Sequence, residues 1–323
     1  MKNFEYIYPK TMESIPKILK ESNGKALLYA GGTDAIARIK EGIVKPSQLV
    51  NLKSLKTSNF IKEDADGLHI GALTRLVELI NNADAQKYTG LIQAAKSVGS
   101  IQLRNMGTVG GNLCQRPRCW YFRSRHFPCL RKQGEICYAV DGENKYHCIL
   151  GGDPCFIVHP SDLAPMLISL NASVRILGLE GSKEVKLEDF FVLPEKDPTR
   201  ETILSKQEVL TEVVVPNKKV KSYFLKHKER KSLDFALVSI AVAGDVEGGK
   251  LNNIRITLGG VAPIPWRAKK TEEMLAGQTA SEPLLEKAAE AELKDAVPLA
   301  QNEFKVYLTK NLLKRAIREF IAS

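Results

Sequence analysis

Six cysteines lie in one stretch of the chain, residues 114–155, and the rest of the sequence contains none. Clustered thiolates are ligands for zinc ions and iron–sulfur clusters. Disulfides and inert buried thiols are the alternatives, but a chain of 323 residues needs no disulfide scaffold, and inert thiols would be spread along the sequence. This stretch, the cysteine segment, therefore predicts a metal or cluster site drawn from Cys114, Cys119, Cys129, Cys137, Cys148 and Cys155.

Two glycine-rich segments predict a second kind of chemistry. One is Ala30-Gly31-Gly32-Thr33-Asp34, and the other runs from Gly107 to Asn112. Paired glycines let the backbone approach a ligand, and successive N–H groups suit phosphate oxygens. Each segment alone also fits an ordinary tight turn, and neither matches a G-x-G-x-x-G or P-loop pattern. Two such segments in one domain favour the pyrophosphate of a dinucleotide.

The elements that position these segments follow from hydrophobic periodicity and turn residues. Thr74 is expected to cap the helix that follows it. The cysteine segment has no regular periodicity, and a loop of that length needs something to hold it. Strands are expected at 25–30, 48–52, 68–70, 172–177, 209–215, 222–227, 236–246 and 253–258, and helices at 34–41, 74–80, 91–98, 270–275, 282–296 and 302–321.

This order of elements predicts an α+β chain of two domains. The basic segment 217–221 follows Pro216 and marks the expected boundary. We expect a ligand-binding domain over 1–218, in which 113–158 form an insertion. A smaller C-terminal α+β domain, with a three-stranded sheet and helices, is expected over 219–323.

Composition sets broader limits. With 44% hydrophobic and 26% charged residues, the chain reads as a globular protein without an apolar run long enough to span a membrane. Its first residues lack a signal-peptide core, so we expect a cytoplasmic location. The net charge of +10 fits nucleic acid, anionic cofactors or acidic partner subunits. No nucleic-acid-binding motif accompanies it, so nucleic acid is the weaker interpretation.

Seven segments spread over nearly the whole chain carry a recognisable pattern: Leu27–Asp34, Ile70–Thr74, Gln102–Asn112, Ser161–Pro165, Glu208–Leu210, Phe224–Lys226 and Leu258–Ala262. In sequence and in order, they resemble the motifs of the FAD-binding medium subunit of the molybdenum hydroxylases, the xanthine dehydrogenase and carbon monoxide dehydrogenase family. The resemblance implies the two-part FAD-binding domain of that family. It implies cofactor contacts from Leu27, Leu28, Tyr29, Ala30, Gly31, Gly32, Thr33, Asp34, Thr74, Gly107, Thr108, Gly110, Gly111, Asn112, Asp162, Leu210 and Lys226.

Two charged residues of this set, Asp162 and Lys226, have a specific chemical role to offer. The carboxylate of Asp162 suits a hydroxyl or a ring N–H, and Lys226 would stabilise a reduced, anionic flavin. Without the resemblance, the favoured interpretations are that Asp162 is a helix cap before Leu163 and that Lys226 is a solvated strand residue.

The cysteine segment is similar to that of a subset of the family, the beta subunit of 4-hydroxybenzoyl-CoA reductase and the FAD subunit of periplasmic aldehyde oxidoreductase. That likeness implies a [4Fe-4S] cluster on Cys119, Cys129, Cys137 and Cys155, with Cys148 as the alternative to Cys155 and Cys114 packed near the flavin. Arginines of the segment would offset the cluster's negative charge: Arg116, Arg118, Arg123 and Arg125. The C-x₂-C pairs typical of zinc sites are absent.

The resemblance thus implies an electron-transfer subunit that contains FAD and [4Fe-4S] and no catalytic residue of its own. The expected partners are a small subunit with [2Fe-2S] clusters and a large subunit with the molybdenum cofactor, in a heterotrimer or a dimer of heterotrimers. Two alternatives stay open: a zinc-stabilised flavoprotein without a cluster, and a basic nucleic-acid-binding or scaffold protein.

Overall fold

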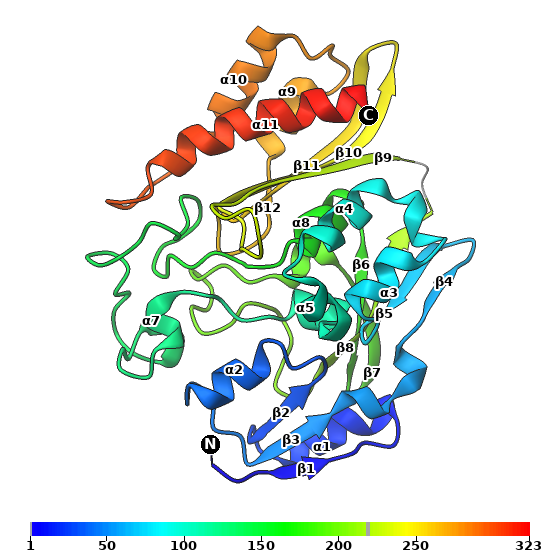
Figure 1. Ribbon diagram of the computed structural model, residues 1–323, viewed down its shortest axis with the longest axis vertical. Helices are drawn as coiled ribbons and strands as arrows, with labels where there is room; N and C mark the ends of the chain where they lie inside the picture. The colour runs from blue at the N-terminus through cyan, green and yellow to red at the C-terminus, as the bar shows by residue number, and fades with distance from the viewer. Residues whose placement is uncertain (1, 218–219) are drawn as a thin grey trace.

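In the computed structural model, which describes residues 2–217 and 220–323, the strands form three sheets (Figure 1). The first sheet is parallel, in the order β1-β3-β2. Apolar side chains of α1, among them Ile15 and Leu19, join Val50 in a small core at this end. The elements are β1 (Glu5–Ile7), α1 (Ile15–Glu21), β2 (Ala26–Tyr29), α2 (Ala35–Lys40) and β3 (Gln48–Asn51).

The second sheet is antiparallel, in the order β4-β5-β8-β6-β7. Its central strand β8 is rich in valine and almost fully buried, as the β-branched run 213–215 predicts. Its strands are β4 (Ile61–Glu63), β5 (Gly67–Gly71), β6 (Ser173–Gly178), β7 (Gly181–Lys186) and β8 (Val209–Pro216), and the associated helices are α3 (Leu76–Asn81), α4 (Thr89–Ser97), α5 (Ile101–Met106), α6 (Val109–Leu113) and α8 (Leu163–Ser169).

The third sheet belongs to the C-terminal part and has the antiparallel order β12-β11-β10-β9. Helices α4 and α8 contact this sheet, and Figure 1 shows them between it and the second sheet; α9, α10 and α11 lie on its other side. The prediction of three strands was wrong, because the two residues of β12 are too few to show alternation. The elements are β9 (Lys221–His227), β10 (Val238–Glu247), β11 (Lys250–Gly259), β12 (Trp266–Arg267), α9 (Lys269–Leu275), α10 (Glu282–Leu293) and α11 (Phe304–Ala322).

The cysteine segment is irregular, as predicted. Its longest helical stretch is the single turn α7 (Trp120–Arg123). Thr74 is not the predicted helix cap: its hydroxyl donates to the Phe60 carbonyl oxygen, and Arg75 precedes α3 instead. The domain boundary predicted between 218 and 219 falls outside the described residues.

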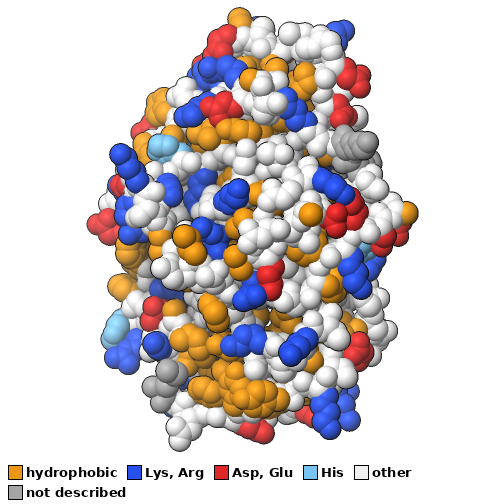
Figure 2. Space-filling view, turned by 45° about the vertical axis from the view of Figure 1, so that its right-hand side comes forward, with side chains coloured by type: hydrophobic (Ala, Val, Ile, Leu, Met, Phe, Trp, Pro, Cys, Tyr) orange, Lys and Arg blue, Asp and Glu red, His pale blue; other side chains and the backbone are white. Residues whose placement is uncertain are grey.

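The distribution of surface charge and the hydropathy of the helices complete the description of the fold. On the face drawn in Figure 2, lysine and arginine side chains are interspersed with acidic ones. Within 2–217 and 220–323, no helix combines the length and the apolar character needed to cross a membrane.

Candidate functional site

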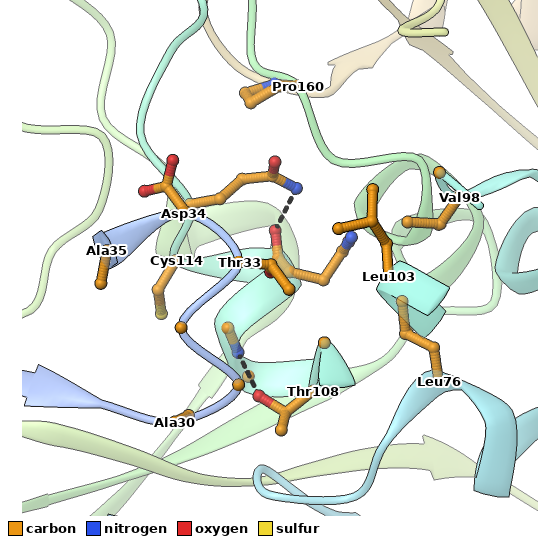
Figure 3. A pocket seen from close by; sticks show the side chains of 18 of the residues that line it. Ala30, Thr33, Asp34, Ala35, Leu76, Val98, Leu103, Thr108, Cys114 and Pro160 are labelled. Carbon is orange, nitrogen blue, oxygen red and sulfur yellow. Dashed lines mark hydrogen bonds between the residues drawn. The ribbon is translucent and has the colours of Figure 1, made fainter. Parts of the chain in front are cut away.

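Both glycine segments border one cavity of about 480 Å³, called the glycine cavity below. Apolar side chains of Leu76, Val98 and Leu103 gather on one side of it, opposite Asp34 and Ala35 (Figure 3). The sequence-predicted residues in its lining are Leu28, Ala30, Gly31, Gly32, Thr33, Asp34, Gly107, Thr108, Gly110, Gly111, Asn112, Asp162 and Leu210.

Four predicted residues are not among those lining the cavity: Leu27, Tyr29, Thr74 and Lys226. Side chains of a strand alternate between its faces, so Leu28 and Ala30 reach the cavity while Leu27 and Tyr29 point away. The Tyr29 ring instead lies 6.4 Å from that of Tyr6, with the Lys53 ammonium over it.

The first glycine segment joins β2 to α2 and lies against the start of the second. A Cβ at position 31 would be only 2.0 Å from the carbonyl oxygen of Met106, so no larger residue fits there. Gly32 has a φ of +76°, which favours glycine. Close contact between the two segments therefore depends on glycine.

The second glycine segment is a short helix, α6, and not the loop that was predicted. Thr108 caps it, because its hydroxyl accepts the backbone N–H of Gly111 at 3.1 Å (Figure 3). Gly110 packs against Ala72, the residue that follows β5, and a Cβ at position 110 would lie 2.8 Å from the Cβ of Ala72. The Asn112 side chain accepts a hydrogen bond from Ser161 at 2.6 Å and so links α6 to the start of α8.

Asp34 connects the glycine cavity to the cysteine segment. Its carboxylate pairs with Arg38 of α2 at 3.0 Å, with Arg123 at 2.6 Å and with Arg118. Burial opposes ionisation, but the Arg118, Arg123 and Arg38 guanidinium groups hold the pKa of Asp34 below its usual value. Three cations around one anion leave a positive excess beside the cavity, which suits an anionic ligand.

A buried ion pair lies at another part of the glycine cavity. The Lys226 ammonium is 2.6 Å from the carboxylate of Asp162, and both side chains are almost inaccessible to solvent. Burial raises the pKa of Asp162, and the pairing with Lys226 counteracts that rise. Asp162 borders the cavity, whereas Lys226 is not among the lining residues and contacts Asp162 from behind the cavity wall.

Part of the cavity lining comes from the connection between β9 and β10, which was not predicted from the sequence. Leu233, Asp234 and Phe235 border the cavity, and the Arg118 guanidinium lies 5.1 Å from the Phe235 ring centre. In the sequence, the signal is a pair of large apolar residues, Leu233 and Phe235, within a charged stretch, and no local pattern links that stretch to the glycine segments.

The four cysteines expected to ligate a cluster line a second, small pocket of about 10 Å³, called the cysteine pocket. Cys148, also buried, is not among the residues lining it, and Cys114 borders the glycine cavity instead. All six thiols are free. Across the described ranges, no three or more His, Cys, Asp or Glu side chains are arranged to hold a single metal ion. The pocket is lined by Cys119, Tyr121, Phe122, Cys129, Leu130, Arg131, Cys137, Tyr138, His147, Cys155 and Ile157.

Arg131 is the arginine that borders the cysteine pocket, and it was not among the four predicted to offset charge there. It is buried, and one of its nitrogens lies 2.6 Å from Glu201. A hydrogen bond from Cys137, together with Arg131, lowers the pKa of the Cys155 thiol. Of the predicted arginines, Arg116 pairs with Glu201, Arg118 and Arg123 with Asp34, and Arg125 is exposed.

A two-domain α+β chain whose two glycine segments share one cavity is typical of proteins that bind a dinucleotide cofactor. Residues 2–218 match the family described as the FAD binding domain in molybdopterin dehydrogenase, and 223–320 match the CO dehydrogenase flavoprotein C-terminal domain. The chain therefore belongs to the FAD-binding medium subunits of the molybdenum hydroxylases, the flavoprotein subunits of molybdenum-containing oxidoreductases.

Individual relatives agree over almost the full length. The chain is 34% identical over 301 residues to the aldehyde oxidoreductase FAD-binding subunit PaoB of Escherichia coli. This match covers 91% of each chain. It is 27% identical over 287 residues to the glyceraldehyde dehydrogenase medium chain of Sulfolobus acidocaldarius. That match covers 88% of this chain and 85% of the relative. A solved structure of carbon monoxide dehydrogenase from Hydrogenophaga pseudoflava contains a similar chain. The TM-score is 0.80 at 26% identity, and the match covers 99% of this chain and 98% of that one.

Proposed function

We propose that this FAD-binding subunit also carries a [4Fe-4S] cluster and transfers electrons between the flavin and iron–sulfur centres of a molybdenum-dependent oxidoreductase. The observation that carries the proposal is the shared pocket of Cys119, Cys129, Cys137 and Cys155, from which Cys148 is absent. Four thiolates are the ligand set of such a cluster.

The residues around both sites fit the two cofactors in chemical kind. Beside the glycine cavity, Arg38 and Arg118 suit the diphosphate of FAD, and the buried Nε of Arg118 has no hydrogen-bond partner among the described residues. Beside the cysteine pocket, Arg131 offers a buried positive charge to a cluster of four thiolates. When bound, FAD would accept or donate two electrons and pass them singly to iron–sulfur centres.

The chain's own residues position these groups and supply no acid–base chemistry. The two glycine segments would hold the diphosphate, and Asp162 and Leu210 would border the rest of the cofactor. Asp34 would keep the cysteine segment against the FAD site through Arg118 and Arg123. We place the FAD-binding domain over 1–218, the cluster insertion over 113–158, and the C-terminal domain over 219–323.

We further propose that the substrate site lies on a large molybdenum subunit and that a small [2Fe-2S] subunit completes the complex, as a heterotrimer or a dimer of heterotrimers. The relatives support this: one is named as an FAD-binding subunit and another as a medium chain.

Metal analysis of the complex, purified without oxygen, tests the cluster. We expect Cys155→Ser to lower the iron content by about four irons per chain relative to wild type. Cys148→Ser is the matched control, since it is buried in the same segment, and it should retain all the iron. Zinc in place of this iron, or equal iron loss in both variants, would contradict the proposal.

A further inference from the structure

His147 is a buried residue of the cysteine segment with no role in the function proposed above. Its side chain borders the cysteine pocket, and its Nε2 lies 3.2 Å from the Sγ of Cys119. A cysteine sulfur bound to iron has no proton to donate. In a loaded site this contact is therefore a hydrogen bond only if Nε2 carries the proton and donates it to sulfur.

The C-terminal domain holds His147 by its backbone. The His147 carbonyl oxygen accepts hydrogen bonds from Asn302 Nδ2 at 3.1 Å and from Lys305 Nζ at 2.9 Å. Asn302 also donates to the carbonyl oxygen of Cys148 at 3.1 Å. Asn302 and Lys305 are fully buried at the start of α11, so neither exchanges these bonds for water.

A second pair of contacts fixes the same turn. The backbone N–H of Asn144 donates to the Gln301 side chain at 3.1 Å, and the backbone N–H of Gln301 donates to the Asn144 side chain at 2.9 Å. The His147 N–H closes the turn onto the Asn144 carbonyl oxygen at 3.0 Å. Residues 144–148 are thus clamped to the C-terminal domain, and the imidazole projects from this clamp to Cys119.

We propose that His147 is a positioning residue that raises the reduction potential of the cluster by donating its Nε2 proton to Cys119, and that the C-terminal domain keeps it there through Asn302 and Lys305. The proposal rests on the cluster proposed above. A donor to a ligating sulfur withdraws electron density and stabilises the reduced, more negative cluster. Arg131, whose guanidinium pairs with Glu201, borders the same pocket and adds a buried cationic side chain near the thiolates.

Replacement of the imidazole in the assembled complex tests this role. His147→Leu removes the donor, and a potentiometric titration followed by electron paramagnetic resonance should show a lower midpoint potential at unchanged iron content. His147→Gln can still place an amide N–H near Cys119 and should return the potential toward the wild-type value. His126→Leu, at an exposed histidine of the same segment, should leave it unchanged.

Pulsed electron paramagnetic resonance of the reduced complex, prepared with ¹⁵N-histidine, gives an independent signature. Wild type should show a weak nitrogen coupling and an exchangeable proton that His147→Leu lacks. If His147→Leu does not load iron, the midpoint potentials of His147→Asn and His147→Gln are compared instead. Only the longer glutamine side chain reaches the Cys119 sulfur, so His147→Gln should have the higher potential. Equal potentials for those two variants, or for His147→Leu and wild type, would overturn the proposal; a wild-type complex without this cluster's iron would overturn both it and the proposed function.

Discussion

The carboxylate of Asp34 and the guanidinium of Arg123 lie 2.6 Å apart, although 89 positions separate them in the chain. Asp34 ends the first glycine segment, and Arg123 ends the one-turn helix that follows Cys119. One ion pair therefore joins the cavity expected to hold FAD to the segment expected to hold the cluster. Arg118 makes the same connection from the other side of α7.

Removing the charge of Asp34 should loosen this connection. Asp34→Asn keeps the shape of the side chain but leaves Arg38, Arg118 and Arg123 without their anion in a largely buried site. We expect a loss of about 3 kcal/mol in the stability of the FAD-binding domain. The measurement is the temperature at which the complex releases its flavin, followed by fluorescence.

Asp84→Asn provides the control for that change. Asp84 pairs with Lys87 at 3.3 Å on the surface, so its loss should cost less than about 1 kcal/mol. Equal flavin-release temperatures for the two variants would show that the buried ion pairs of Asp34 stabilise the domain no more than a surface ion pair does.

Gly31 gives a steric prediction. Alanine at this position would place its Cβ 2.0 Å from the Met106 carbonyl oxygen, so the two glycine segments must move apart. We expect Gly31→Ala to lower the flavin content of the purified complex severely, measured as the ratio of FAD to protein. Gly178→Ala is the control, because its nearest neighbour, the Glu208 side chain, lies 3.3 Å away and can shift. Full flavin content in Gly31→Ala would contradict the steric argument.

The sequence predicted the parts of these sites that depend on local chemistry. Glycine pairs, and six cysteines in a single irregular stretch, are visible without a structure. Both glycine segments border one cavity, and four of the six cysteines share one pocket. The short helix α6 was missed because its five residues include two glycines, which are poor helix formers.

Side-chain partners distant in sequence could not be predicted. The arginines of the cysteine segment were expected at the cluster because they are near the cysteines in the chain. Their positions depend instead on carboxylates elsewhere, on Asp34 of the first glycine segment and on Glu201. The hydrogen bonds that hold His147 could not be predicted for the same reason, since their donor Asn302 lies 155 positions away in the chain.

The pair of Asp162 and Lys226 predicts strong coupling between two substitutions. Lys226→Met leaves a buried carboxylate unpaired and should cost about 3–5 kcal/mol, because burial penalises its charge. Asp162→Asn combined with Lys226→Met removes both charges and should recover much of that loss. A double-mutant cycle on flavin-release temperature measures the coupling. Additive effects of the two single changes would mean that the pair does not act as a unit.

His159 predicts a specific sensitivity to acid. Burial lowers the pKa of His159 to about 3, from an ordinary value of 6.5, so the folded chain keeps this imidazole neutral where the unfolded chain takes up a proton. The unfolded state then binds more protons than the folded state between these two values, and stability falls as the pH falls through that window. From pH 7 to about pH 5 the contribution lost is about 2 kcal/mol.

His159→Gln removes this titration, so its stability should change less over that pH range than the stability of wild type, whatever its starting value. The measurement is the midpoint of urea-induced unfolding at several pH values between 7 and 5, with His126→Gln as the control at an exposed position. His126→Gln should follow the wild-type slope, since its side chain is exposed to water in the folded chain. Parallel pH profiles for His159→Gln and wild type would show that the buried imidazole is not the group that makes the fold sensitive to acid.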